Sequence, residues 1–228
     1  MIHTATLFTN MNRIKGILWD NDGVLVNTEH LFYEANREIF AEHGIDLTPQ
    51  HFFDWFLTEN FGAWHLLHEI GYTQAQTDAL RESRNQRYSE RLMREDRLGN
   101  AGIDQVLARL SKRVPMGIVT SAQKEHFCLI HDKLALRPYF DFVVTEEDTK
   151  ESKPSPEPYL LGLKKLDVAA EECLVIEDSP RGVQAARAAG IRCIVLRHAL
   201  MQGFPFEGAF RVVDTPTQLL ETIEAMLA

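Results

Sequence analysis

Cysteine is scarce in this chain of 228 residues. Its three cysteines, Cys128, Cys173 and Cys193, lie 45 and 20 residues apart, and no Cys-x-x-Cys pair occurs. An odd number of cysteines at these spacings predicts neither a disulfide framework nor a structural zinc site. We therefore expect a reduced, cytoplasmic protein.

Positive charge and long apolar runs are lacking as well. The 24 Lys and Arg residues are outnumbered by 33 Asp and Glu, which gives a formal net charge of −9. This balance disfavours a general nucleic-acid partner or an anionic membrane surface. No run approaches the roughly 18 apolar residues that a membrane-spanning helix needs, and residues 1–12 do not resemble a secretion signal. We expect no nucleic-acid or membrane partner, and a monomer or weak dimer.

Strand patterns are absent from about residue 48 to residue 98, where the apolar spacing is helical. Thr73-Gln-Ala-Gln76 has the spacing of a capping box that opens a long helix ending near Arg97. A helix is also predicted over residues 28–43, with Gly44 as its stop. These helices interrupt a different pattern on either side, so we predict a small inserted helical domain over residues 30–98.

The rest of the chain alternates strands and helices. Strands are predicted over residues 14–19, 114–119, 142–145, 173–177, 192–196 and 210–213. Helices are predicted over residues 103–110, 124–134, 157–166, 182–189 and 216–227. This alternation predicts an α/β fold, a doubly wound parallel sheet with helices on both faces. The predicted sheet domain comprises residues 13–29 and 99–228, after an N-terminal tail of residues 1–12.

Two carboxylates follow the first predicted strand, in Asp20-Asn-Asp22-Gly23. Ligands bind beyond the carboxyl ends of strands in an open parallel sheet, and adjacent carboxylates repel each other there unless a cation lies between them. Oxygen ligands favour a hard ion such as Mg²⁺, and the pair provides one group to attack and one to move a proton. A calcium loop of the EF-hand type is disfavoured because its glycine would stand two positions later. Two Asp residues that only cap local turns remain an alternative.

Three further polar segments follow later strands. The hydroxyl and backbone N–H groups of Thr120-Ser121 can hold phosphate oxygens, or they can cap a helix. Lys153 stands among three prolines that could fix it at the site, or it belongs to a rigid surface turn. Glu177-Asp178 adds two carboxylates, or a helix cap. Taken together at one edge of the sheet, these groups match phosphoryl transfer, which depends on positioning and charge neutralisation.

The four segments resemble the motifs of the haloacid dehalogenase superfamily of phosphatases, in the branch similar to β-phosphoglucomutase and phosphoglycolate phosphatase. They read Asp20-Asn-Asp22-Gly-Val-Leu, Thr120-Ser121, Lys153-Pro-Ser-Pro and Glu177-Asp178-Ser-Pro-Arg-Gly182. The resemblance covers the chain from about Arg13 to Leu227. It implies a Rossmann-like sheet core and a helical cap domain that closes over the substrate. The helical domain predicted at residues 30–98 fits that cap.

The resemblance also implies a role for each motif residue. Asp20 is expected to be the nucleophile that forms an aspartyl-phosphate. Asp22 is expected to be the acid for the leaving alcohol and then the base for the attacking water. Thr120, with Ser121, is expected to bind the phosphoryl oxygens, and Lys153 to bridge the nucleophile and the phosphoryl group.

The cofactor that the resemblance implies is Mg²⁺. Its expected ligands are Asp20, the backbone carbonyl of Asp22, and Asp178. Glu177 is expected near or in the same coordination shell.

Departures from related families narrow the expected reaction. Phosphonate-cleaving relatives use a cap lysine, but this chain has no lysine between Lys15 and Lys112. The 2-haloacid dehalogenases do not need the second Asp, so Asp22 favours phosphate esters. Mutases carry a histidine where this chain has Phe32, which cannot shuttle a proton. Asn27 stands where the family usually has Asp, and we expect this change to alter the tuning of the site rather than abolish activity.

Substrate recognition is expected from the cap. Arg84-Asn85 matches a basic-residue–Asn pair that reaches the substrate in similar enzymes. Arg87, Arg91 and Arg94 share its helical stripe. For these three we expect a solvated, salt-bridged face.

Two other cap features are less specific. His65 and His68 are three residues apart on a predicted helix, but no third metal ligand is evident, so we expect a structural pair. Phe61-Gly-Ala-Trp64 carries no charge, which favours a monophosphate with a small or partly apolar body.

We therefore predict a Mg²⁺-dependent phosphatase of a small phosphorylated metabolite, such as a sugar phosphate or a phosphoglycolate-like acid. Two alternatives remain. One is a sugar phosphomutase, and the other is a catalytically silent sensor that has kept the fold.

Overall fold

Six short strands form one parallel sheet in the computed structural model, which describes residues 13–59, 61–198 and 201–227. Their order across the sheet is β3-β2-β1-β4-β5-β6, and each neighbouring pair is parallel. The strands are β1 (Gly16–Trp19), β2 (Met116–Val119), β3 (Phe142–Val144), β4 (Cys173–Glu177), β5 (Arg192–Leu196) and β6 (Arg211–Val213). The predicted N-terminal tail, residues 1–12, lies outside the described residues.

All six predicted strands are present, and only some of their ends differ. β4 and β5 match the prediction at both ends, whereas β1 begins two residues later than predicted. The reason is that the N–H groups of Ile14 and Lys15 donate to carbonyls outside the sheet, those of Met226 and Glu172.

The helices beside the sheet are α5 (Ile103–Leu110), α6 (Lys124–His131), α7 (Glu157–Leu166), α8 (Pro180–Ala188) and α9 (Pro216–Leu227), with short 3-10 turns η3 (Arg137–Tyr139), η4 (Glu146–Asp148) and η5 (Ala170–Glu172). Among these helices, α5, α7 and α9 match their predicted bounds, whereas α6 and α8 differ from theirs. α8 begins two residues before the predicted start because Ser179 caps it and Pro180 suits its first turn.

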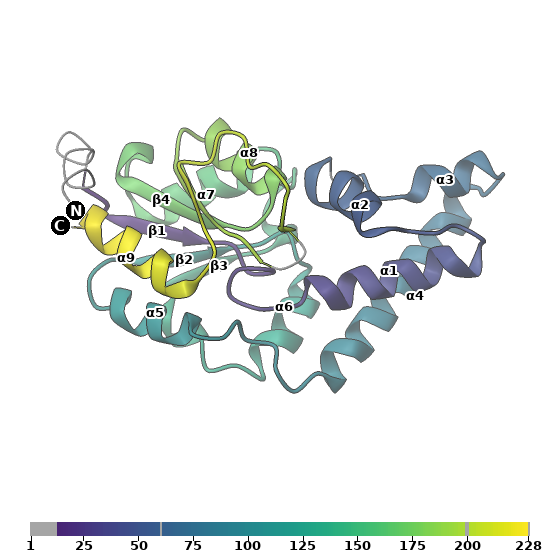
Figure 1. The fold of residues 1–228 in the computed structure, drawn as a ribbon, viewed down its shortest axis with the longest axis horizontal. Helices are drawn as coiled ribbons and strands as arrows, with labels where there is room; N and C mark the ends of the chain where they lie inside the picture. Colours follow the sequence, from purple (N-terminus) through teal and green to yellow (C-terminus); the bar gives the residue numbers. More distant parts are fainter. Residues whose placement is uncertain (1–12, 60, 199–200, 228) are drawn as a thin grey trace.

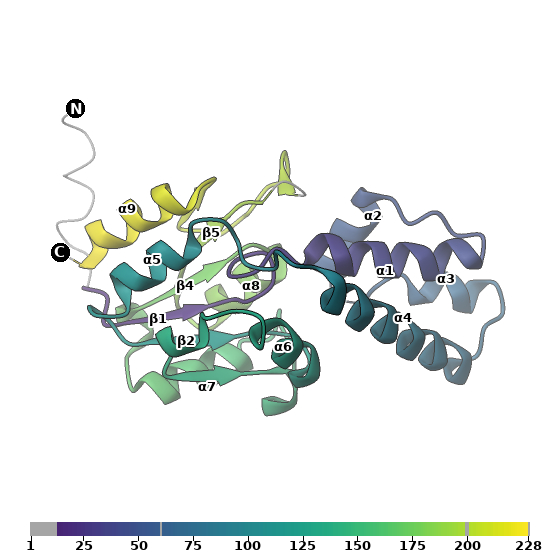
Figure 2. The ribbon, with the colours of Figure 1, turned by 90° about the horizontal axis from the view of Figure 1, so that it is seen from below.

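Side chains of the strands alternate between two buried layers. Ile17 and Trp19 of β1 pack in one apolar cluster with α5, α6 and α9, whereas Leu18 packs in another with α7 and α8. Figures 1 and 2 show these helices on the two faces of the sheet. This layering confirms the predicted doubly wound α/β fold.

The strand order reverses direction at β1, because β2 and β3 lie on one side of it and β4, β5 and β6 on the other. In open α/β sheets the crevice beyond the carboxyl ends of the strands at such a point binds ligands. The loops that follow β1 and β4 therefore meet where a ligand site is expected.

Residues 29–94 hold a separate group of helices, which we call the cap. They are α1 (Glu29–Glu42), α2 (Pro49–Phe52), the π-helix η2 (Phe53–Thr58), α3 (Trp64–Glu69) and α4 (Gln74–Arg94). Thr73 opens α4 with the predicted capping box. Figures 1 and 2 show the cap gathered beyond one end of the sheet. The helical character of this stretch agrees with the prediction, while the domain boundaries at residues 30–98 remain predictions.

The cap has its own apolar cluster, which we call the cap cluster. Its buried members are Ile39, Phe40, Leu47, Phe52, Phe53, Phe56, Leu57, Ala63, Trp64, Leu67 and Met201. Met201 comes from the segment after β5 rather than from the cap helices. In the same segment, the ring of Phe204 stacks on Phe53 with ring centroids 3.7 Å apart. The sheet and the cap are thus joined by apolar packing.

The chain enters and leaves the cap through two adjacent segments. Val26 and Gly99 form an antiparallel bridge, and the N–H of Asn27 donates to the carbonyl of Leu98 over 2.7 Å. The two connections therefore lie side by side. Within the part of the chain that the structure describes, no helix has the length and apolarity needed to cross a membrane.

Candidate active site

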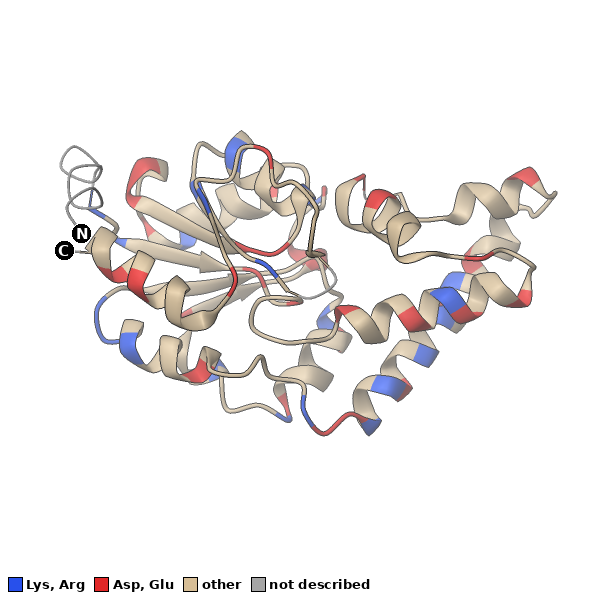
Figure 3. Cartoon of the chain, viewed as in Figure 1, with Lys and Arg blue, Asp and Glu red and all other residues tan. Residues whose placement is uncertain are grey.

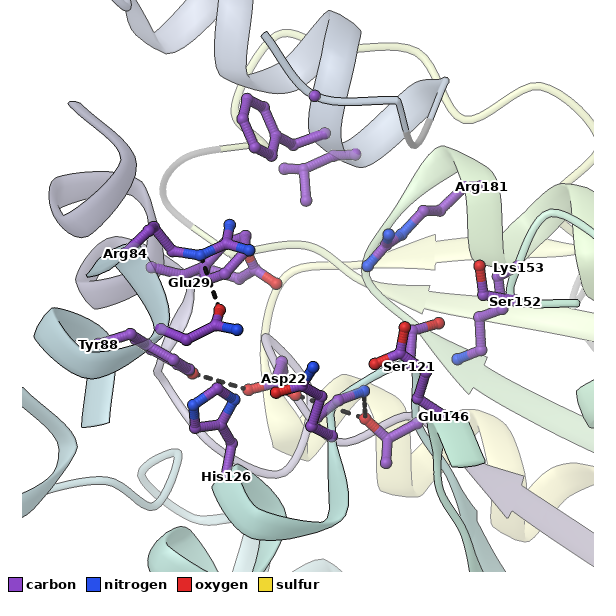
Figure 4. A pocket seen from close by; sticks show the side chains of 18 of the residues that line it. Asp22, Glu29, Arg84, Tyr88, Ser121, His126, Glu146, Ser152, Lys153 and Arg181 are labelled. Atoms are coloured by element: carbon purple, nitrogen blue, oxygen red, sulfur yellow. Dashed lines mark hydrogen bonds between the residues drawn. The ribbon is translucent and has the colours of Figure 1, made fainter. Parts of the chain in front are cut away.

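A cavity of about 570 Å³ lies between the carboxyl edge of the sheet and the cap. Its polar floor comes from the loops that follow the strands, and its roof includes Phe32, Phe56 and Trp64 of the cap. In Figure 4, Arg84 and Tyr88 stand on one side of the opening, and Arg181 and Lys153 on the other. The structure therefore brings the residues predicted from separate strands to one cavity.

Asp20 lies at the end of β1 and is paired with a buried lysine. The Lys153 ammonium donates to Asp20 Oδ1 over 2.5 Å, to Glu177 Oε1 over 2.6 Å and to the carbonyl of Val119 over 2.9 Å. Lys153 is 1% exposed, so the two carboxylates are what balance its charge in a dry site. Burial opposes this charge, but the carboxylates of Asp20 and Glu177 raise the pKa of Lys153 above its ordinary value.

Glu177 accepts hydrogen bonds on both of its oxygens. Besides Lys153, the hydroxyl of Tyr159 donates to Oε1 over 2.6 Å. Oε2 accepts from the hydroxyl of Ser179 and from the N–H groups of Asp178 and Ser179. Burial opposes ionisation, yet Lys153 and these donors hold the pKa of Glu177 below its ordinary value. Gly182 makes room for this arrangement, because a Cβ there would lie 1.9 Å from the carboxylate. This geometry suits a residue that positions Lys153.

Asp178 lies over the glycine of the first motif. A Cβ on Gly23 would meet Asp178 Oδ2 at 1.9 Å, and Gly23 has a φ of 78°. Only glycine satisfies both the close approach and the left-handed backbone. The imidazole Nε2 of His198 lies 3.0 Å from Asp178 Oδ2.

The carboxylates of Asp20, Glu177 and Asp178 form a buried group whose ligand atoms lie within 4.8 Å of one another. Burial, together with the charge of Glu177, raises the pKa of Asp20 and of Asp178 well above the ordinary value. Such repulsion is what a divalent cation relieves, and an all-oxygen donor set suits Mg²⁺. The residues present therefore fit the expected metal, with Asp20 and Asp178 as the carboxylates best placed to hold it, since both oxygens of Glu177 have protein donors.

Asp22 sits at the cavity floor and is held by hydroxyl groups from both parts of the molecule. Thr28 donates to Asp22 Oδ1 over 2.5 Å, and Tyr88 of the cap donates to the same oxygen over 3.5 Å. Thr120 of the sheet donates to Oδ2 over 3.5 Å. The contact between Thr28 and Asp22 is present in this chain, which carries Asn27 at the preceding position.

The loop that carries Asp22 is fixed from below. Asn21 is fully buried and accepts from His131 Nε2 over 2.8 Å. The amide of Asn100 donates to the carbonyls of Gly23 and Val24. Burial lowers the pKa of His131 to about 4, so this histidine is neutral near pH 7.

Thr120 and Ser121 follow β2 and line the cavity beside Asp20 and Asp22. The N–H of Ala122 donates to Thr120 Oγ1 over 3.0 Å. Ser121 Oγ is buried without a hydrogen-bond partner among the described residues. A free hydroxyl donor at this place suits a phosphoryl oxygen.

Arg84 enters the cavity from α4 with Asn85. Its guanidinium donates to Asn85 Oδ1 over 2.9 Å and to Asn36 Oδ1 over 3.0 Å. It also lies 4.6 Å from the ring centroid of Phe32 and 5.7 Å from that of Trp64. Burial, with the neighbouring Arg81, lowers the pKa of Arg84 to about 10. The side chains that contact its guanidinium are neutral amides and aromatic rings, so this cation suits an anionic or strongly polar ligand.

The other arginines of the predicted stripe face away from the cavity. Arg87 pairs with Glu42, Arg91 with Glu34 and Glu38, and Arg94 with Glu90. Figure 3 shows this band of opposite charges along α1 and α4. The prediction of a salt-bridged face agrees with these contacts.

The predicted histidine pair is structural. His65 meets the rings of Trp55 and Phe61 edge-on, and His68 Nδ1 lies 2.9 Å from the carbonyl of Tyr72. Neither belongs to the acidic group described above.

Sequence reasoning missed several residues of the cavity. Glu29 is 8% exposed, and its Oε2 has no hydrogen-bond partner in the described part of the chain. Burial, then Asp178 and Asp22, raise the pKa of Glu29 to about 8. Glu29 lies close after the first motif, so its position was a usable clue. Arg181 lies within the fourth motif but was given no role there, and Glu146 begins the 3-10 turn η4 without a distinctive local pattern.

A doubly wound sheet whose acidic edge is covered by a helical insert defines a class of α/β hydrolases. The chain belongs to the haloacid dehalogenase-like hydrolases, whose family profile matches residues 17–196. The predicted family is therefore confirmed, and with it the predicted kind of enzyme, a hydrolase of the phosphatase type.

Similar proteins agree with this assignment. The chain is 31% identical over 222 residues to a phosphorylated carbohydrates phosphatase of Thermotoga maritima, covering 94% of this chain and all of that protein. It is 29% identical to the fructose-1-phosphate phosphatase YqaB of Escherichia coli, covering 81% of this chain and 97% of that one. A solved β-phosphoglucomutase of Clostridium difficile has a TM-score of 0.79 at 23% identity, covering 94% of this chain and 97% of that one, and shows the shared fold.

Proposed function

We propose that this chain is a Mg²⁺-dependent phosphatase that hydrolyses a small phosphorylated carbohydrate through an aspartyl-phosphate on Asp20. The observation that carries the proposal is the placement of Asp20. Its Oδ1 is held by Lys153, and its carboxylate lines the same cavity as Asp22, Thr120 and Ser121. Oδ1 of Asp20 is thus fixed by Lys153, while the carboxylate still lines the cavity.

In the first step, a carboxylate oxygen of Asp20 attacks the phosphorus and the bond to the sugar oxygen breaks. Asp22 gives its proton to that oxygen, which leaves as an alcohol. In the second step Asp22 takes a proton from water, the water oxygen attacks the phosphorus, and the Asp20–phosphorus bond breaks. Asp20 is then restored and inorganic phosphate is released.

Other residues neutralise and orient the phosphoryl group. Lys153 balances the charge of Asp20, and the hydroxyl groups of Thr120 and Ser121 donate to phosphoryl oxygens. Asp20, Asp178 and the carbonyl of Asp22 would hold Mg²⁺, which supplies charge neutralisation for the transferring group. Glu177 holds Lys153 in place.

The sugar would lie towards the cap. Phe32 and Trp64 give the cavity apolar side chains that suit the C–H groups of a sugar, and Arg84, Glu146 and Arg181 offer polar groups at its rim. Two similar proteins are named for phosphorylated carbohydrates and for fructose 1-phosphate, which supports this substrate class.

A mutase would need a proton-transferring group over the leaving oxygen. Where mutases carry a histidine, this chain has Phe32, which packs edge-on against Phe52, Phe56 and Tyr88. A phenyl ring has no group that can transfer a proton. Hydrolysis is therefore favoured. A silent sensor is disfavoured because the residues of all four motifs are present and meet at one cavity.

The test is phosphate release from a panel of sugar monophosphates, phosphoglycolate and an aryl phosphate, with Mg²⁺ and with EDTA. We expect Mg²⁺-dependent release that is fastest for sugar phosphates, and none above background for Asp20→Asn. Phosphate release by Asp20→Asn at the wild-type rate would exclude Asp20 as the nucleophile. Isomer formation from a hexose 1-phosphate without phosphate release would favour the mutase.

A further inference from the structure

The histidine that contacts Asp178 has no counterpart in the four motifs. His198 is the second residue after β5, and its Nε2 lies 3.0 Å from Asp178 Oδ2. A carboxylate that binds a metal is ionised and only accepts hydrogen bonds, so Nε2 is the donor when Asp178 serves as a metal ligand. The side chain of His198 is 14% exposed and that of Asp178 is 2% exposed, so the contact is shielded from water. It takes up one oxygen of Asp178 and leaves Oδ1 for another partner.

The backbone of His198 is tied to the cap. The N–H of Met201 donates to the carbonyl of His198 over 2.9 Å, and the side chain of Met201 is 1% exposed within the cap cluster. The N–H of Phe204 donates to the carbonyl of Met201 over 3.3 Å, and its ring stacks on Phe53 of η2. A continuous set of contacts therefore runs from Asp178 to the cap.

We propose that His198 is a positioning residue for the metal site, which fixes Asp178 through Nε2 and is itself held by the packing of Met201 in the cap cluster. This inference rests on the proposed function, because it takes Asp178 as a metal ligand. A group that hydrogen-bonds to a metal-ligating side chain fixes the orientation of that side chain. Loss of such a group typically weakens metal binding about 10- to 100-fold. The cap thereby contributes to Mg²⁺ binding without touching the ion.

The first experiment compares Mg²⁺ binding by isothermal titration calorimetry in wild type, His198→Phe and His198→Gln. Phe keeps the ring but removes the donor, whereas the Gln amide restores a donor near the place of Nε2. We expect His198→Phe to weaken Mg²⁺ binding about 10- to 100-fold and His198→Gln to recover most of the loss. His68→Phe on the surface of α3 is the matched control and should bind Mg²⁺ as wild type does.

Two outcomes would overturn the role of His198. One is unchanged Mg²⁺ binding in His198→Phe, and the other is an equal loss in His198→Phe and His198→Gln. If His198→Phe does not fold by circular dichroism, His198→Ala removes the same donor without a bulky ring. Phosphate-release kinetics give a second readout: the Mg²⁺ concentration for half-maximal rate should rise, while kcat at saturating Mg²⁺ should change little.

The link to the cap is tested by Met201→Ala against Leu67→Ala. Both remove a large side chain from the cap cluster, but only Met201 is bonded to His198. We expect weaker Mg²⁺ binding in Met201→Ala and no change in Leu67→Ala at similar loss of thermal stability. Equal Mg²⁺ binding in the two variants would refute the link.

These results are separable from the proposed function. If wild type binds no Mg²⁺ in calorimetry, the proposed metal site itself fails. If wild type binds Mg²⁺ and hydrolyses sugar phosphates while His198→Phe binds equally well, only the inference about His198 fails.

Discussion

Each end of the cavity holds a cationic side chain, and the two ends do so in different ways. At the sheet end, Lys153 is enclosed by Asp20 and Glu177 at hydrogen-bond distance. At the cap end, Arg84 meets two neutral amide oxygens and two aromatic rings, and no carboxylate of the described residues pairs with it. Lys153 therefore has its counter-charges before substrate arrives, whereas Arg84 would obtain a counter-charge from the ligand.

This difference predicts that loss of the lysine has the largest effect. Lys153→Met leaves Asp20 and Glu177 buried beside each other without a cation. Breaking a buried ion pair in this way costs about 3–5 kcal/mol in the free energy of unfolding, and loss of the charge facing the phosphoryl group should reduce kcat by about 10²-fold or more. Urea unfolding and phosphate release measure the two effects. The exposed Lys164→Met is the control, and a similar loss there would contradict the comparison.

The second prediction concerns the glycine beneath Asp178. Gly23 and Gly44 have nearly the same φ, 78° and 75°, but a Cβ at Gly44 meets nothing within 4 Å. Both Gly→Ala changes should cost about 1 kcal/mol of backbone strain. Only Gly23→Ala should also displace Asp178 and weaken Mg²⁺ binding, by at least about tenfold. Equal Mg²⁺ affinities in the two variants, measured by calorimetry, would contradict the close approach.

The third prediction separates two arginines of α4. Arg84→Met removes a charged donor of the cavity that we place against the substrate, so KM should rise about 10- to 100-fold, as expected for loss of a charged hydrogen bond. Arg91→Met removes only surface ion pairs with Glu34 and Glu38, which are worth about 1 kcal/mol or less. Steady-state kinetics on the best sugar phosphate should therefore show an unchanged KM for Arg91→Met. An equal rise in both variants would place the substrate elsewhere.

The smallest effect on catalysis is expected from the histidine below the first motif. The pKa of His131 is about 4 in the folded chain against an ordinary 6.5, so the unfolded chain binds the proton first as pH falls. The contribution of His131 to the free energy of unfolding is complete above pH 6.5. It falls by about 3 kcal/mol in all as the pH is lowered towards 4. Urea midpoints across this range measure it. His131→Gln keeps a donor for Asn21 without titrating, and should make the decline shallower; an identical decline would exclude His131 as its source.

The sheet end could be predicted almost completely from the sequence. Asp20, Thr120 and Asp178 directly follow short apolar strands, and parallel strands end at one edge, so these three had to meet. Lys153 comes from the proline-rich loop after η4, which returns to the same edge. The number of donors on Glu177 could not be predicted, because Tyr159 reaches it from α7. Whether Glu177 itself binds the metal stays a prediction.

The cap end was less accessible to such reasoning. Arg84 and Arg91 occupy one helical stripe in the sequence, and only the packing of Phe32 and Trp64 distinguishes the arginine at the cavity from the one paired with surface carboxylates. His198 was missed because its segment has no periodic pattern, and its partner lies 20 residues away in the chain. Long-range contacts of this kind depend on the complete fold.

The paired connections between sheet and cap have a consequence for how such chains diversify. Because Val26 bridges Gly99, everything between them leaves the sheet and returns to it at one place. A gene segment encoding the helices can therefore be lengthened, shortened or exchanged while the ends it must join stay adjacent. The four motifs lie in the sheet domain, so changes in the cap helices can alter substrate specificity while the motif residues stay the same.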